Sequence, residues 1–169
     1  MVSLMSESDA PMGPTPGYLV WRLSMKWRVA VDRALVAQGL THAQYSLLAA
    51  LLATQRSGRT PTQRELADAT GLEALYVSKL ARALEGTGLI ARTPHPTDTR
   101  AVQLSLTDHG REATERAITV VHQLLDRLLA PLGGWDSPRT AVLTRELKSL
   151  LNAPLDVTND VTNDATNQE

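Results

Sequence analysis

Residues 62–106 read TQRELADATGLEALYVSKLARALEGTGLIARTPHPTDTRAVQLSL, and the patterns within these residues indicate the fold class. Thr62 followed three residues later by Glu65 is a capping-box pattern, which predicts the start of a short helix. Gly71 ends that helix, because glycine accepts the left-handed conformation found after helix C-termini. A second helix is expected over about 73–85. The order helix, glycine turn, helix predicts a helix-turn-helix unit.

After this second helix the hydrophobic period changes to two residues. The alternation over 89–93 and 101–106 predicts two short strands of a hairpin. The polar segment between them contains Pro94 and Pro96, and we expect both prolines to lie outside the ladder because proline has no N–H to donate. A helix-turn-helix followed by a hairpin with a charged tip predicts a winged helix-turn-helix.

Helical patterns continue on both sides of this unit. Apolar residues at three- and four-residue spacing predict a helix over about 18–38, and a capping box at Thr41 opens the next one. Beyond the hairpin, Thr107 caps a long helix that runs to about Leu132, and a last helix begins near Pro138. We therefore predict a mainly α protein with a small β-hairpin wing.

The predicted organisation has one folded body between two tails. The parts are a disordered N-terminal tail (1–16), a body (17–151) in which a winged helix (about 41–106) lies between terminal helices (about 17–38 and 108–151), and an acidic low-complexity tail (152–169). The chain has 17 Lys+Arg and 18 Asp+Glu. Because the tails hold six of the acidic residues and none of the basic ones, the body carries a formal charge of about +5. A basic body is typical of a protein that binds a polyanion.

Composition excludes several classes of protein. Without cysteine the chain has no disulfide framework and no thiolate zinc site. No apolar run approaches the ~20 residues of a membrane span, and no signal peptide is visible, so we expect a cytoplasmic protein without a membrane partner. The chain has no glycine-rich phosphate loop and no nucleophile elbow, so we expect neither an enzyme nor a bound cofactor.

Six short motifs follow one another along the chain: Leu40–Leu48 (LTHAQYSLL), Thr62–Ala67 (TQRELA), Val77–Leu80 (VSKL), Leu84–Arg92 (LEGTGLIAR), Asp98–Arg100 (DTR) and Leu106–Gly110 (LTDHG). In this order and spacing they resemble motifs of the MarR family of bacterial transcription regulators, and the resemblance covers about residues 18–151. The chain departs from the family pattern at two positions. Leu75 stands where a small polar residue is usual, and Glu73 stands where Ser or Asp often caps the recognition helix.

A DNA-binding role is expected for one face of the second helix of the motif and for the wing. We expect Leu80, Ala83 and Leu84 to pack inward and the opposite face to meet the major groove. The candidate residues are Arg64, Tyr76, Ser78, Lys79, Arg82, Arg92, Asp98 and Arg100. Arg100 at the hairpin tip is suited to a narrow minor groove, and we expect Asp98 to pair with it and hold its direction. Arg64 and Arg92 are lesser candidates for phosphate contacts.

The terminal helices have more apolar surface than a single winged helix requires. The resemblance implies that they form a homodimer, which would place two recognition helices on a pseudo-palindromic double-stranded DNA operator. It also implies a repressor released by a small-molecule effector, often an aromatic or phenolic anion. The candidate effector residues are Trp21, Arg22, Trp27, His42 and Tyr45, although core packing is an alternative role for Trp27 and Tyr45.

Two other functions remain as alternatives. The first is a winged-helix protein-interaction module without specific DNA binding, which Leu75 and the modest charge leave open. The second is a metal-responsive regulator that would use some of the four histidines, His42, His95, His109 and His122. Because the chain has no cysteine and no His-x-x-x-His pair, we predict no metal site.

Overall fold

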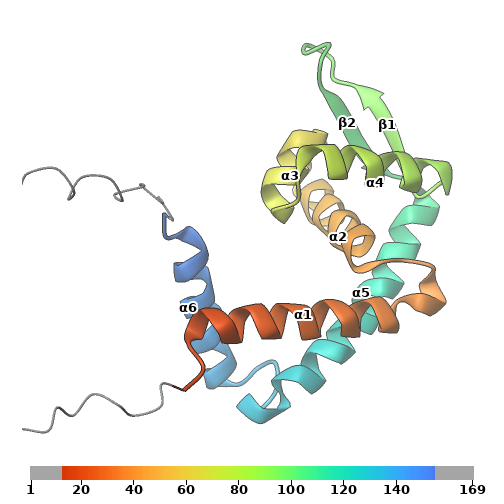
Figure 1. Ribbon diagram of the computed structural model, residues 1–169. Helices are drawn as coiled ribbons and strands as arrows, with labels where there is room; N and C mark the ends of the chain where they lie inside the picture. The colour runs from red at the N-terminus through yellow and green to blue at the C-terminus, as the bar shows by residue number, and fades with distance from the viewer. Residues whose placement is uncertain (1–12, 155–169) are drawn as a thin grey trace, which may run out of the picture. The chain divides into compact units, whose positions relative to one another are not determined.

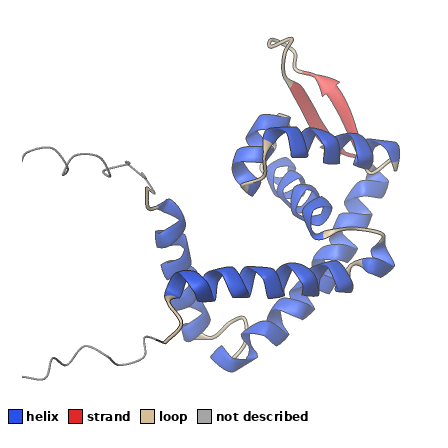
Figure 2. Ribbon diagram, in the orientation of Figure 1, coloured by secondary structure: helices blue, strands red, loops and turns tan. Residues whose placement is uncertain are grey.

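The computed structural model describes residues 13–154, so the predictions for the tails fall largely outside the described residues. The elements are α1 (Pro16–Ala34), η1 (Val36–Gln38), α2 (His42–Arg56), α3 (Gln63–Thr70), α4 (Ala74–Gly86), β1 (Ile90–Pro94), β2 (Val102–Leu106), α5 (Asp108–Leu129), η2 (Ala130–Leu132) and α6 (Pro138–Asn152) (Figures 1 and 2). This order confirms the predicted mainly α fold with a β-hairpin wing. The chain divides into two compact units, 1–125 and 126–169. No described helix is long and apolar enough to cross a bilayer.

The helix starts follow the capping residues. The Thr41 side chain accepts a hydrogen bond from the Gln44 N–H, and the Gln44 side chain accepts one from the Thr41 N–H in return. Thr62 and Glu65 repeat this reciprocal pair at the start of α3. Both pairs satisfy backbone donors that the first helical turn leaves free. Glu73 caps α4 without a side-chain hydrogen bond, as its departure from the family pattern suggested.

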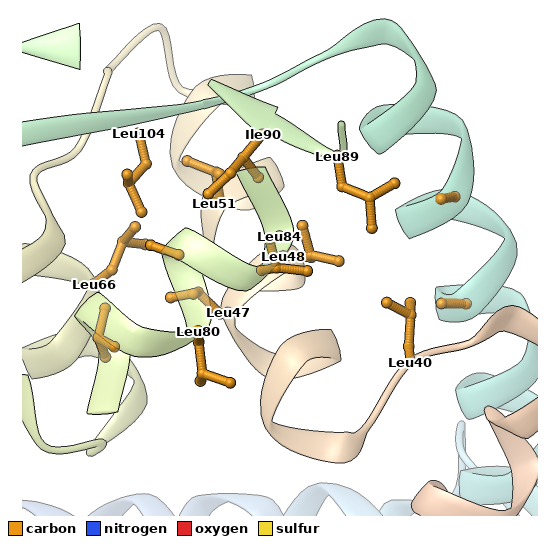
Figure 3. Close-up of a cluster of buried hydrophobic side chains, with 14 of the residues drawn as sticks. Leu40, Leu47, Leu48, Leu51, Leu66, Leu80, Leu84, Leu89, Ile90 and Leu104 are labelled. Carbon is orange, nitrogen blue, oxygen red and sulfur yellow. The ribbon is translucent and has the colours of Figure 1, made fainter. Parts of the chain in front are cut away.

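Leucine side chains from α2, α3, α4 and the hairpin form the core of the first unit (Figure 3). The prediction for α4 was partly wrong. Its buried face consists of Val77, Leu80, Ala81 and Leu84. Ala83 is exposed, and so is Leu75, at 84%. Sequence alone does not separate Ala81 from Ala83, because alanine is found both in buried and in exposed positions of helices.

The hairpin is antiparallel, and its register pairs Ile90 with Leu106 and Pro94 with Val102. The expectation that Pro94 lies outside the ladder was therefore wrong. The next residue, His95, donates its N–H to the Ala101 carbonyl at 3.0 Å. Hydrogen-bonded and non-bonded pairs alternate in an antiparallel ladder, so Pro94 occupies a pair that needs no N–H.

The hairpin is anchored to the helical part of the unit at the middle of β2 and at its inner end. In the middle of β2, the Leu104 N–H donates to the Pro61 carbonyl at 2.9 Å, which links β2 to the segment before α3. At its inner end, the Thr107 hydroxyl donates to the Gly88 carbonyl at 2.7 Å and accepts the Gly110 N–H at 2.9 Å. These bonds hold the wing beside α3 and α4, from which it projects (Figure 1).

The second unit contains the C-terminal end of α5, η2 and α6. Ser137 caps α6, and its hydroxyl also donates to the Leu132 carbonyl at 2.6 Å. The hydroxyl of Thr140, a residue that is only 5% exposed, donates to the Gly134 carbonyl at 2.7 Å. These bonds close the turn between η2 and α6. The large apolar side chains of α6 that remain exposed are Val142, Leu147, Leu150 and Leu151.

Candidate nucleic-acid interface

The outward face of α4 carries a stripe of four side chains, Leu75, Ser78, Lys79 and Arg82. Their spacing of three and four residues places them on one side of the helix, opposite the buried face. Three of them are exposed and Ser78 is partly buried. Tyr76 lies at the flank of this stripe and is 42% exposed. Within residues 13–154, neither Lys79 nor Arg82 takes part in an ion pair, so both cations are available to an external anion.

The loop at the wing tip is organised by two side chains that bind its backbone. The His95 Nδ1 atom accepts hydrogen bonds from the N–H groups of Thr97 (3.3 Å) and Asp98 (3.2 Å). The Asp98 carboxylate accepts the Arg100 backbone N–H at 3.0 Å. We had expected Asp98 to pair with the Arg100 side chain, but the bond it makes is to the backbone. Arg100 is exposed, and across the described residues its guanidinium takes part in no ion pair. Its positive charge is therefore not neutralised.

The two lesser candidates differ from each other. Arg64 is exposed in the first turn of α3. The Arg92 guanidinium instead pairs with Glu85 at 3.2 Å, and its side chain is only 25% exposed. The buried Nε atom of Arg92 has no hydrogen-bond partner. Arg92 therefore connects β1 to the end of α4, and Glu85 is a partner that sequence reasoning missed because the two residues lie in different elements.

The capping-box carboxylate adds negative charge near α3. Hydrogen bonds from the Thr62 backbone and hydroxyl lower the pKa of Glu65, with a smaller contribution from Arg59. Glu65 also accepts a hydrogen bond from Arg59 at 2.6 Å. Because the two charges of this pair offset each other, Arg59 adds less to the positive electrostatic potential near the wing than an unpaired arginine would.

The five candidate effector residues differ in burial. Trp27 and Tyr45 are partly buried against the core, and burial raises the pKa of Tyr45. Trp21 and Arg22 are exposed on α1, where the Arg22 guanidinium lies 5.9 Å from the centre of the Tyr18 ring. In the single chain, Trp27 and Tyr45 therefore pack against the core, which was the alternative to a role in effector binding.

His42, the fifth of these residues, lies at the first position of α2. Its backbone N–H donates to the Asp32 carboxylate at 2.6 Å, which joins α1 to α2. Partial burial lowers the pKa of the His42 imidazole, and this effect outweighs the opposing charge of Asp32. Arg28 lowers the pKa further.

A cavity of about 520 Å³ lies elsewhere in the first unit. Its lining comes from η1, α2, the end of α4 and α5, and includes the polar residues Gln38, Gln44, Thr87, His109 and Arg116. The buried Oε1 atom of Gln38 has no hydrogen-bond partner there. Sequence reasoning missed this cavity because its lining residues are far apart in the chain and form no motif. Over residues 13–154, no three His, Asp or Glu side chains gather as a metal site would require.

Known proteins are similar to this chain in sequence and in fold. A sequence profile of the MarR family matches residues 38–101. The uncharacterized HTH-type transcriptional regulator YdcH of Bacillus subtilis is 36% identical over 110 residues, which cover 65% of this chain and 75% of the relative. The HTH-type transcriptional repressor Rv2887 of Mycobacterium tuberculosis is 32% identical over 143 residues, covering 85% of this chain and 92% of the relative.

Solved structures of transcription regulators are also similar to this chain. The repressor CouR bound to a 23-mer DNA duplex is 31% identical with a TM-score of 0.65, over 85% of this chain and 96% of that one. CouR of Rhodococcus jostii RHA1 bound to p-coumaroyl-CoA has a TM-score of 0.68 and 26% identity, over 85% and 95% of the two chains. Sequence, fold and interface lead to one conclusion: this chain belongs to the MarR family, whose members are DNA-binding transcription regulators and not enzymes.

Proposed function

We propose that this protein is a homodimeric repressor that binds a pseudo-palindromic DNA operator and is released by a small-molecule effector. The observation that carries the proposal is the exposed stripe on α4 beside a wing whose tip presents an unpaired arginine. An α-helix fits the major groove of B-DNA, and its N-terminal residues are the ones that contact base edges in helix-turn-helix proteins.

The candidate residues divide between phosphates and bases. Lys79 and Arg82 supply the charge that DNA binding requires, and Ser78 and Tyr76 supply hydroxyl groups for phosphates or base edges. Arg100 enters the minor groove, where a narrow A·T-rich segment has the most negative potential. Asp98 acts on this arginine through the loop backbone. Arg64 and Arg92 stay as weaker phosphate candidates, Arg92 the weaker because Glu85 already neutralises it.

Dimerisation is supported by apolar surface that the single chain leaves uncovered. The N-terminal half of α1 exposes Tyr18, Leu19, Val20, Trp21, Leu23 and Met25 at between 38% and 56%. In the second unit, α6 exposes Leu150 at 65% and Leu151 at 84%. A monomer rarely leaves apolar patches of this kind open, and a second copy of the chain would cover them.

The effector would act by favouring a conformation of the dimer that no longer matches two successive half-sites. We propose the 520 Å³ cavity as its site, because Arg116 and His109 suit a carboxylate and the unpaired Gln38 Oε1 suits a hydroxyl donor. The p-coumaroyl-CoA complex of CouR supports a phenol as part of the ligand, since the p-coumaroyl group carries a phenol hydroxyl. Trp21, Arg22, Trp27, His42 and Tyr45 remain the alternative site, to which a second protomer would have to contribute.

The function is tested by selecting duplexes from a random DNA pool with the full chain and measuring their affinity by fluorescence anisotropy. We expect the selected duplex to bind at least about 10³-fold more tightly than a scrambled duplex at physiological salt. Equal affinity for the two duplexes would contradict the proposal and favour the protein-interaction module. The effector site is tested separately with Arg116→Ala, which should lower affinity for aromatic carboxylates and leave DNA affinity unchanged.

A further inference from the structure

Leu75 is the apolar member of the stripe on α4. It is 84% exposed, whereas Val77, Leu80, Ala81 and Leu84 on the opposite face are all buried. The core of the unit therefore gains nothing from Leu75, and water must hydrate its side chain in the free protein. A polar residue at this position would be at least as compatible with the fold.

The neighbours of Leu75 indicate what would cover it. Ser78 and Lys79 lie one turn further along the same face, and Arg82 lies two turns away. Two unpaired cations beside it favour a polyanion over an apolar protein surface. A protein partner would also need a contiguous apolar patch of several hundred square ångströms, and one leucine does not provide it.

Because Leu75 lies near the N-terminus of α4, we expect it to contact base edges and not phosphates. Leu75 is the second residue of the helix, in the turn that contacts base edges when a recognition helix enters the major groove. An aliphatic side chain can neither donate nor accept a hydrogen bond. The apolar group that the major groove presents is the C5-methyl group of thymine.

We propose that Leu75 reads the C5-methyl group of a thymine in each half-site and so sets part of the sequence preference. This inference rests on the proposed function, because it requires α4 to enter the major groove of a specific duplex.

The experiment uses the full chain and a duplex selected from a random pool. Each thymine is replaced in turn by deoxyuridine, which pairs identically with adenine but lacks the methyl group, and affinity is measured by fluorescence anisotropy. At the contacted thymine, wild type should lose about fourfold in affinity, the value expected for one buried methyl-sized group. Leu75→Ala should bind the unmodified duplex correspondingly less tightly and should show no further loss with deoxyuridine at that position.

Leu75→Ile is the matched control, because it retains an aliphatic side chain and should keep the dependence on the methyl group. Circular dichroism should show that both variants are folded, since the side chain is outside the core. If Leu75→Ala keeps the full deoxyuridine profile of wild type, Leu75 does not read thymine and the inference is overturned while specific binding stands. If no duplex is selected above random DNA, the proposed function fails and this inference fails with it.

Discussion

Gly110 is the residue at which the first turn of α5 meets the backbone before β1. A Cβ atom added there would lie 1.8 Å from the Leu89 carbonyl oxygen, which is backbone and cannot rotate away. We expect Gly110→Ala to destabilise the protein by about 1–3 kcal/mol, the usual cost of overpacking. Thermal unfolding monitored by circular dichroism measures the effect. Gly86→Ala is the control, because a Cβ atom there meets nothing within 4 Å, and an equal loss in both variants would contradict the packing argument.

His42 should make stability depend on pH. Because burial lowers its pKa below the ordinary value of 6.5, its contribution to stability is fully present above that value and is lost as the pH falls below it. We expect the melting temperature of wild type to fall more steeply than that of His42→Gln between pH 7 and pH 5. The variant keeps the backbone bond to Asp32 while it removes the titrating group. Parallel melting curves for the two proteins would show that His42 does not contribute.

At the residue scale, sequence predicted what depends on near neighbours. The capping boxes at Thr41 and Thr62 were correct because both partners lie within one turn. Features that depend on the path of a loop or on strand pairing were not predicted correctly. The binding of Asp98 to the backbone depends on the exact path of the loop, and the pairing of Pro94 depends on the hairpin register.

At the element scale, α1 should be a dimer contact. Leu19 and Leu23 lie one turn apart on this helix and are 51% and 44% exposed. We expect the double variant Leu19→Glu/Leu23→Glu to change the mass measured by light scattering from twice the chain mass to the 18.3 kDa of one chain. Operator affinity should fall with it, because two half-sites would no longer be bound together.

Val36→Glu is the control for this change, since Val36 is 74% exposed and lies beyond the end of α1. A wild type that is already monomeric at micromolar concentration, or a double variant that stays dimeric, would contradict this role for α1. The sequence indicated both terminal helices as partners because their apolar stripes exceeded what one domain could cover. It could not indicate the 520 Å³ cavity, whose walls come from four separate elements.

At the scale of the whole molecule, the net charge of −1 conceals an uneven distribution. Residues 17–151 hold all 17 Lys and Arg, and the acidic ends lie largely outside the described residues. DNA binding by such a protein should weaken steeply as salt rises, because each neutralised phosphate releases a counterion. We propose that α4 and the wing bring this positive charge to a specific duplex, with Arg100 in the minor groove.

The most direct test is the salt dependence of operator affinity for wild type and Arg100→Ala. Arg100→Ala should bind the operator more weakly than wild type, and its slope of log affinity against log salt should be smaller by about 1 for each bound wing. Arg145→Ala, which removes another exposed positive charge, one that lies on α6 and pairs with Glu146, should leave the slope unchanged. Identical affinity and slope for wild type and Arg100→Ala would contradict the claim that the wing tip binds DNA.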